Sequence, residues 1–230
     1  MRVLAVGAHP DDVEFSCGGT LAKYARAGHT VIMAYATNGD KGHFRIPPSE
    51  LACIREKEAR QAAAVIGAEV IWMGYPDGDL FYDRPTRERF VDMLRQARPD
   101  IILTQNPDAY HPDHCATSQL VFGASFLATV PHFTTRYPAC DHPAPIYYFE
   151  PATTQRMHPP LYVDISDVFA LKVEMAKAHQ SQLTWIKEHD GIDVLARTEE
   201  RAQQLGRLCG ATYAECFYPR HPGKAQTLLP

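Results

Sequence analysis

Several features are lacking in this sequence of 230 residues, and each absence excludes a class of protein. No apolar run approaches the roughly 18 residues that a membrane-spanning helix needs. The opening apolar stretch is too short for a secretory signal peptide and leads directly into polar residues. We therefore expect a cytoplasmic protein that has no membrane partner.

Paired cysteines and an excess of basic residues are lacking as well. The six cysteines are scattered along the chain and form no CxxC motif, so we expect reduced thiols. The formal net charge of −4 gives no electrostatic reason to bind nucleic acid. No internal repeat or low-complexity segment interrupts the chain. The 45% hydrophobic and 22% charged residues are instead typical of a globular protein with an ample core.

Short apolar runs recur about 30 residues apart in the first half of the chain, and amphipathic segments separate them. This order predicts an α/β fold: a Rossmann-like, doubly wound, mostly parallel sheet with helices on both faces. The predicted strands cover residues 3–8, 30–36, 69–73 and 100–105, and the predicted helices cover 18–28, 50–66, 86–97 and 112–127.

The last third of the chain has a different pattern. Prolines are dense over residues 131–160, and short strands are predicted at 146–149 and 161–165, followed by helices over 166–183 and 197–209. We interpret 131–230 as a C-terminal extension of the same sheet within one domain over 1–230. The loops at 44–48 and 131–160 are expected to shape specificity.

Two short motifs follow the first and fourth predicted strands: AHPDD at residues 8–12 and HPDH at 111–114. The carboxyl ends of parallel strands meet at one edge of a sheet, where open α/β folds bind ligands. His9, Asp12 and His114 can therefore surround one metal ion, and two histidines with a carboxylate are a common ligand set for catalytic zinc. The same set also suits non-haem iron. Adjacent Asp11 and Asp12 suit one ligand and one base, but spacing alone does not assign the two roles.

The order of motifs along the chain resembles the PIG-L/LmbE-like family of zinc-dependent N-deacetylases. The resemblance implies a Rossmann-like fold without a nucleotide and a substrate that is an N-acetylated amino sugar or its conjugate. It rests on AHPDD, then GGT, TNGD, IREKEARQAAAVIG, YPDG, HPDH, VDIS, HQSQ and YAECF, which run from residue 8 to residue 217.

The resemblance also assigns roles position by position. It makes Zn²⁺ the cofactor, with another divalent metal such as Fe²⁺ as the alternative in the cell. Zinc lowers the pKa of a bound water toward about 7, and a carboxylate beside the metal can act as general base. By resemblance, the ligands are His9, Asp12 and His114, the base is Asp11, the group that steadies the oxyanion is His111, and the carboxylate that orients this group is Asp113.

By the same resemblance, the loops after the second and third strands supply groups that bind sugar hydroxyls, namely Asp40, Arg55 and Asp77. Asp40 stands where the family usually has glutamate, so a contact to the sugar is lost or made through water. Arg55 also suits an ordinary salt bridge on a helix, and Asp77 suits a turn. His179 and Glu215 match family motifs without an assigned role.

Three other functions fit parts of the sequence. A non-haem iron oxygenase fits the ligand set, but such sites normally lie on an all-β scaffold. A nucleotide-binding module fits the sheet, but the first loop has no GxGxxG motif. A carbohydrate-binding protein with a structural metal predicts binding without turnover. The partners that we expect are a small acetamido-sugar substrate and further copies of the chain in a homo-oligomer.

Overall fold

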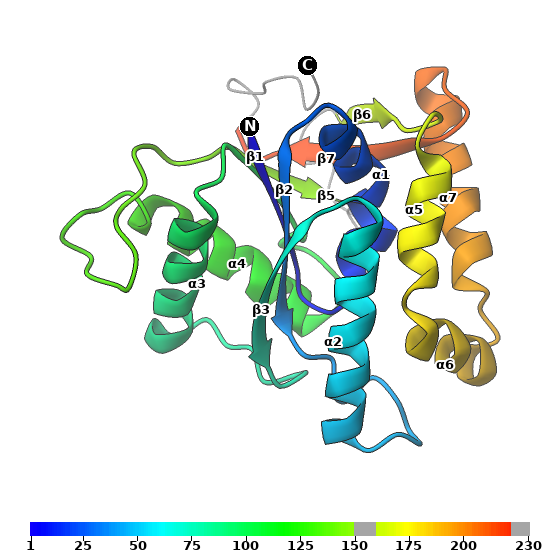
Figure 1. Ribbon diagram of the computed structural model, residues 1–230, viewed down its shortest axis with the longest axis horizontal. Coiled ribbons are helices and arrows are strands. Elements are labelled where there is room, and N and C mark those ends of the chain that lie inside the picture. The colour runs from blue at the N-terminus through cyan, green and yellow to red at the C-terminus, as the bar shows by residue number, and fades with distance from the viewer. Residues whose placement is uncertain (150–159, 222–230) are drawn as a thin grey trace.

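The computed structural model describes residues 1–149 and 160–221, and these form a three-layer α/β structure around one sheet (Figure 1). Seven strands of this part of the chain make a single sheet in the order β3-β2-β1-β4-β5-β7-β6. The strands are β1 (Arg2–Gly7), β2 (Thr30–Thr37), β3 (Glu69–Tyr75), β4 (Ile101–Thr104), β5 (Ile146–Phe149), β6 (Leu161–Asp164) and β7 (Ala214–Pro219).

Strands β3, β2, β1, β4 and β5 are parallel, whereas β7 pairs antiparallel with both β5 and β6. The predicted α/β class with a mostly parallel sheet is thus confirmed. Strand β1 lies between β2 and β4, so the chain winds outward from β1 in both directions. This reversal is the kind of position where doubly wound folds bind their ligands.

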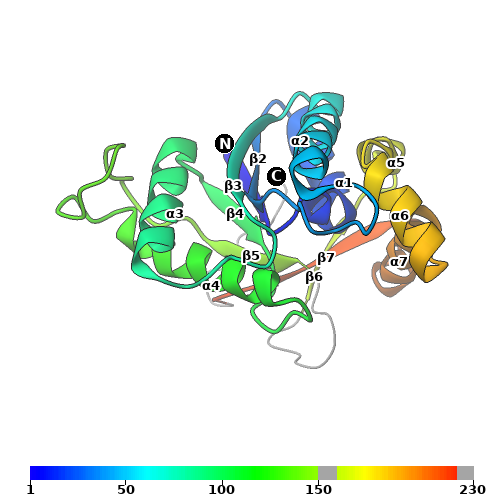
Figure 2. The same ribbon diagram turned by 90° about the horizontal axis from the view of Figure 1, so that it is seen from below.

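Helices cover both faces of the sheet (Figure 2). On one face, α1, α2 and α5 pack over a core that includes Val3, Ala5 and Met33; on the other, α3 and α4 cover Leu4 and Val6. Alternate side chains of β1 thus pack into the cores on opposite faces of the sheet, as expected for a strand covered on both faces. The helices are α1 (Asp12–Arg26), α2 (Pro48–Val65), α3 (Arg84–Ala97), α4 (Pro112–Leu127), α5 (Phe169–Lys177), α6 (Gln180–Asp190) and α7 (Val194–Cys209).

Helix α1 begins earlier than the sequence predicts. It starts at Asp12, directly after β1, so Gly18 and Gly19 lie inside the helix and do not open it. A Cβ atom on Gly19 would lie 2.7 Å from the Ile165 side chain, so the glycine permits a close approach of α1 to the segment after β6. The early start puts Asp12 in the first turn of α1.

The C-terminal third differs from the prediction in two respects. The single helix expected over 166–183 is instead two helices, α5 and α6, separated at residues 178–179. Strand β7 was not predicted, although it joins β5 to β6. Of the proline-rich segment 131–160, residues 150–159 lie outside the described residues. No helix in the described part of the chain is long and apolar enough to cross a membrane.

Candidate active site

The turns after β1 and β4 bring the two histidine motifs together at the carboxyl edge of the sheet. Asp11 has a φ of 133°, an unusual value for a residue with a side chain, in the turn that leads into α1. His111 precedes α4, and its Nδ1 accepts a hydrogen bond from the Asp113 N–H at 3.2 Å. Pro112 is the first residue of α4, where the lack of an N–H has no cost. His111 thus caps the N-terminus of α4.

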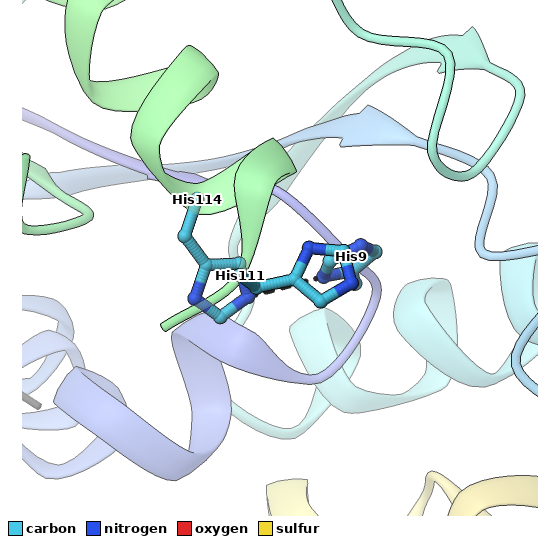
Figure 3. A group of neighbouring side chains, drawn as sticks. All are labelled: His9, His111 and His114. Carbon is cyan, nitrogen blue, oxygen red and sulfur yellow. Dashed lines mark hydrogen bonds between the residues drawn. The ribbon is translucent and has the colours of Figure 1, made fainter. Parts of the chain in front are cut away.

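Ligand atoms of three residues form a small triangle at this edge. His9 Nδ1 lies 3.2 Å from His114 Nε2. Carboxylate oxygens of Asp12 lie 3.4 Å from His9 Nδ1 and 3.3 Å from His114 Nε2. The ring of His111 lies beside the same two histidines (Figure 3), and one nitrogen from each of the three histidines falls within 4.8 Å of the others. The structure therefore brings together the three residues predicted as ligands.

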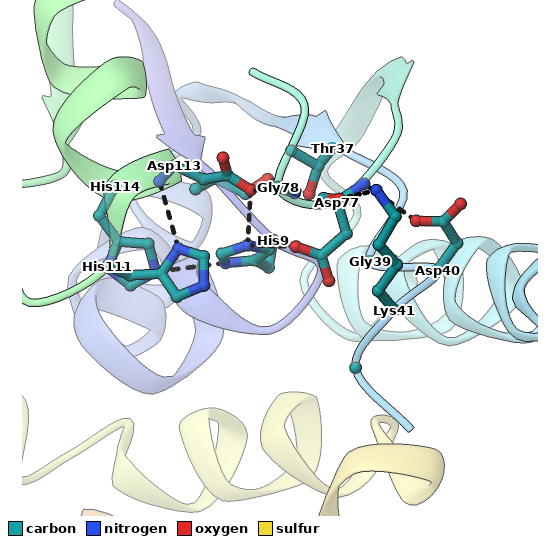
Figure 4. Close-up of polar contacts among 12 residues, drawn as sticks. His9, Thr37, Gly39, Asp40, Lys41, Asp77, Gly78, His111, Asp113 and His114 are labelled. Atoms are coloured by element: carbon teal, nitrogen blue, oxygen red, sulfur yellow. Dashed lines mark hydrogen bonds and ion pairs between the residues drawn. The ribbon is translucent and has the colours of Figure 1, made fainter. Parts of the chain in front are cut away.

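Two carboxylates hold the opposite nitrogen of the His9 ring. His9 Nε2 lies 3.1 Å from Asp77 Oδ1 and 3.3 Å from Asp113 Oδ2 (Figure 4). Burial opposes a charge on His9, but hydrogen bonds to Asp113, Asp12 and Asp77 raise its pKa well above the usual value. Burial likewise opposes a charge on Asp77, yet the hydrogen bond to His9 and the nearby cations lower its pKa to about 2. The two carboxylates favour a proton on Nε2, whereas Nδ1 faces Asp12 and His114 and would lose its proton when a metal ion binds there.

The Asp113 carboxylate has partners other than the one expected from the sequence. Its Oδ2 accepts a hydrogen bond from the Gly78 N–H at 2.7 Å and contacts His9, while His111 is bonded to the Asp113 backbone. Because Nδ1 of His111 accepts this bond, the proton of a neutral ring lies on Nε2. Burial and the neighbouring His9 and His114 also lower the pKa of His111. In this geometry His111 is a neutral donor.

Arg55 lies beneath the Asp11 carboxylate, in the interior of the protein. Its side chain is 3% exposed, and its Nη2 atom donates to Asp11 Oδ2 at 3.1 Å and to the Pro10 carbonyl at 2.6 Å. Its Nη1 atom donates to the carbonyl of Gly39 at 3.1 Å. Burial raises the pKa of Asp11 to about 6, although Arg55 opposes this shift. The contacts of Arg55 thus position Asp11, and its predicted contact with substrate stays a prediction.

Asp40 and Asp77 form a chain of contacts that ends at His9. The Asp40 carboxylate accepts a hydrogen bond from the Asp77 N–H at 2.9 Å, and the Lys41 ammonium donates to the Asp77 carbonyl at 2.5 Å. The loop after β2 therefore holds the loop after β3 in place (Figure 4). The sequence singled out Asp40 and Asp77 as sugar ligands and did not indicate their link to His9.

A second polar group lies buried behind Asp11. Glu14 Oε1 accepts hydrogen bonds from the Tyr35 hydroxyl at 2.7 Å and lies 2.8 Å from His179 Nε2. Burial opposes a charge on His179, but Glu14 and then Asp11 raise its pKa. His179 is thus a buried partner of Glu14, at the break between α5 and α6.

Glu215 joins the last strand to the middle of α1. Its carboxylate accepts hydrogen bonds from the N–H groups of Gly19 and Thr20 at 2.9 and 2.7 Å. Lys172 of α5 donates to Glu215 at 2.6 Å and to the Phe15 carbonyl at 2.7 Å. Both charged side chains are almost completely buried, so each depends on the other for its charge. The motifs that contain His179 and Glu215 therefore hold α1 in place through contacts with Glu14, Gly19 and Thr20.

The triangle of ligand atoms fits a tetrahedral zinc ion. Bonds of about 2.0–2.2 Å to nitrogen and oxygen at tetrahedral angles put neighbouring ligands about 3.3 Å apart. The two imidazole nitrogens lie 3.2 Å apart, and each has a different Asp12 oxygen beside it: Oδ1 is 3.3 Å from His114 Nε2, and Oδ2 is 3.4 Å from His9 Nδ1. Two imidazoles and one carboxylate are also an ordinary donor set for this metal, and the carboxylates behind His9 would orient the ring. Two other sets of possible ligands in the described part of the chain share His9: one is His9, His111 and His114, and the other is His9, Asp77 and Asp113.

Fold and site together define an α/β enzyme whose reactive groups lie at the carboxyl edge of a parallel sheet. The chain belongs to the PIG-L family: the family model, described as GlcNAc-PI de-N-acetylase, matches residues 4–125. The predicted family and the predicted class of enzyme, a hydrolase of carbon–nitrogen bonds, are thus confirmed. The match includes all nine residues that the sequence singled out as site residues.

The chain is similar to deacetylases and also to a hydratase. Diacetylchitobiose deacetylase of Thermococcus kodakarensis is 31% identical over 229 residues, which cover 93% of this chain and 81% of the relative. The crystal structure of N,N'-diacetylchitobiose deacetylase from Pyrococcus horikoshii has a TM-score of 0.82 and 29% identity, with 96% of this chain and 84% of that chain covered. By contrast, 4-oxalmesaconate hydratase of Pseudomonas putida is 26% identical, with 74% of this chain and 69% of the relative covered.

Proposed function

We propose that this protein is a zinc-dependent N-deacetylase that removes the acetyl group from a GlcNAc-type amino sugar or its conjugate. The observation that supports this function most directly is the triangle of His9, Asp12 and His114 ligand atoms beside the buried Asp11 carboxylate. Similarity to two diacetylchitobiose deacetylases supports the sugar part of the proposal.

In this proposal His9, Asp12 and His114 hold the metal. When bound, zinc supplies a Lewis acid and an activated water, which is enough chemistry for an unactivated amide. Asp77 and Asp113 keep the proton of His9 on Nε2, so that Nδ1 faces the metal.

Asp11 acts as the general base: it takes a proton from the attacking water and later gives it to the leaving amine. Arg55 keeps this carboxylate at a fixed place through two carbonyl contacts and the ion pair. His111 donates from Nε2 to the oxygen of the scissile amide as negative charge develops there. The Nδ1 atom of His111 accepts from the backbone, which holds the ring in the required tautomer.

A hydratase is the second candidate, because a relative with this activity covers most of the chain. Both reactions need an activated water and a base, so the same residues would serve either. The products distinguish the two functions, since only the deacetylase releases acetate and a free amine.

The experiment is an end-point assay for acetate and primary amine with zinc-loaded protein. The substrates are N-acetylglucosamine, diacetylchitobiose and N-acetylglucosaminyl-malate, and Asp11→Asn is the matched control for contaminating activity. We expect release of both products from at least one substrate and none from the Asp11→Asn variant. A non-sugar acetamide is assayed beside them, and acetate release from it alone would refute the sugar part and leave the metal part. Assembly into a homo-oligomer and a cytoplasmic location stay predictions.

A further inference from the structure

A large cleft beside the candidate site has no role in the proposed chemistry so far. Its volume is about 1130 Å³, and its lining includes Asp11, Asp12 and His114 together with residues of α6 and α7. Sites for small ligands usually measure roughly 300–1,000 Å³. The cleft is therefore too large for a single acetamido sugar and has space for a group attached to that sugar.

A buried amide marks this cleft as a binding site. Gln105, directly after β4, lines the cleft and is only 5% exposed. Within the described residues its Nε2 atom has no hydrogen-bond partner. An unpaired buried donor is unfavourable, and a rotation of the Gln105 amide would expose Nε2 to an oxygen atom of a ligand in the cleft.

The charged residues of α6 and α7 in this cleft are mostly engaged with neighbours. Asp190 contacts the His189 ring, Glu200 accepts from Gln204, and Arg201 also has a partner. Lys172, from α5, is paired with Glu215. Arg197 differs, because its guanidinium makes no hydrogen bond or ion pair within the parts of the chain that the structure describes.

Arg197 also lies near the mouth of the metal site. The ring of Tyr110 is 5.3 Å from that of His114, and Tyr110 lines the same cleft. Burial raises the pKa of the Tyr110 hydroxyl, and the charge of Arg197 is one of the groups that oppose this rise. Arg197, Tyr110 and the metal-site residue His114 thus line one cleft.

The wall near Arg197 is partly apolar. Ile186 of α6, Ile192 and Val194 line it and would contact a carbon skeleton. A guanidinium matches a carboxylate or a phosphate through two parallel hydrogen bonds. The chemistry of this wall therefore fits a group that combines an apolar part with an oxyanion.

We propose that this cleft holds the group attached to the acetamido sugar, and that Arg197 pairs there with a carboxylate or phosphate of that group. The inference rests on the proposed deacetylase function. It adds a specificity subsite that is lined by residues of the C-terminal third of the chain and by Gln105.

The test compares three glycosides of N-acetylglucosamine: phenyl, 4-carboxyphenyl and 4-phosphophenyl. They share the sugar and the apolar ring and differ in the oxyanion. Arg197→Met removes the charge and keeps most of the side-chain length. Arg207→Met, on the same helix and outside the cleft lining, is the matched control.

We expect Arg197→Met to raise the KM of one or both charged glycosides roughly three- to tenfold, because exposed ion pairs are modest in strength. The KM of the phenyl glycoside and every kcat should not change, and Arg207→Met should have no effect. The charged glycoside whose KM rises more identifies the partner of Arg197 as a carboxylate or a phosphate. An unchanged KM for both charged glycosides, or an equal rise for the phenyl glycoside, overturns the role of Arg197.

Gln105→Leu is the second variant, and we expect it to raise the KM of all three glycosides by a similar factor. If it changes none of them, the cleft is not where the substrate binds. Calorimetric binding of the same glycosides to the Asp11→Asn protein provides a readout that does not need turnover. Tighter binding of the charged glycosides that disappears with Arg197→Met supports the subsite. If the protein without substitutions releases no amine, only the deacetylase function is refuted.

Discussion

Gly39 permits the contact between Arg55 and Asp11, and its replacement by alanine tests whether that contact positions the base. Gly39 has a φ of +63°, and a Cβ atom there would lie 2.6 Å from the Arg55 Cζ atom and 2.8 Å from its Nε atom. The guanidinium must therefore move. A displacement of about 1 Å at a catalytic group typically costs about 10²-fold in rate. We expect Gly39→Ala to lower kcat by about that factor and to retain its zinc.

Gly28 provides the matched control, because its φ is +81° and a Cβ atom there would contact nothing within 4 Å. Alanine in this region costs about 1–2 kcal/mol at either position. For a chain of this length, that corresponds to a fall in Tm of about 2–8 °C. Calorimetry and metal analysis separate stability from positioning, and kcat is compared between the two variants. If Gly39→Ala keeps a kcat within twofold of Gly28→Ala, the guanidinium does not position Asp11.

Four further predictions concern the site and its support. Asp11→Asn should keep zinc and lose most activity, whereas Asp12→Asn should lose zinc by metal analysis, and the reverse result would exchange the two roles. His111→Ala should lower kcat about 10²-fold with little change in KM, and an effect on KM alone would make His111 a simple substrate contact. Asp77→Asn should weaken zinc binding about 10- to 100-fold in a chelator competition, because it no longer orients His9; unchanged affinity would contradict this role. Lys172→Met leaves a buried carboxylate unpaired and should destabilise the protein by about 3–5 kcal/mol in thermal denaturation, with a loss below 1 kcal/mol as the contrary result.

The residues that converge at the sheet edge could be predicted because AHPDD directly follows β1 and HPDH begins the helix after β4. A strand fixes the place of the residue after it, so AHPDD and HPDH needed only the parallel topology to meet. The roles of Arg55 and Asp77 could not be predicted in this way. The charges around Arg55 on α2 suggest a solvated face. Only the structure shows that the Arg55 guanidinium occupies the space where a side chain on Gly39 would lie and is buried there.

The C-terminal third was harder to predict for a different physical reason. Strand β7 pairs with strands far from it in the chain, so no local pattern marks its partners. The break between α5 and α6 depends on His179, which pairs with Glu14, 165 residues away. Helical periodicity continues across this position, so the sequence alone favours one helix.

The bond from Glu215 to Gly19 spans 196 residues and has a consequence for how the protein is made. A ribosome that has translated residue 125 has already supplied both histidine motifs. The carboxylate that supports α1 follows 90 residues later, which at about 5–20 residues per second is about 5–18 s. During this interval the nascent chain has every reactive side chain, while the helix that contains Asp12 still lacks its support from β7. Long-range closure of this kind is a slow step in folding, so we expect the reactive geometry to form after translation of β7.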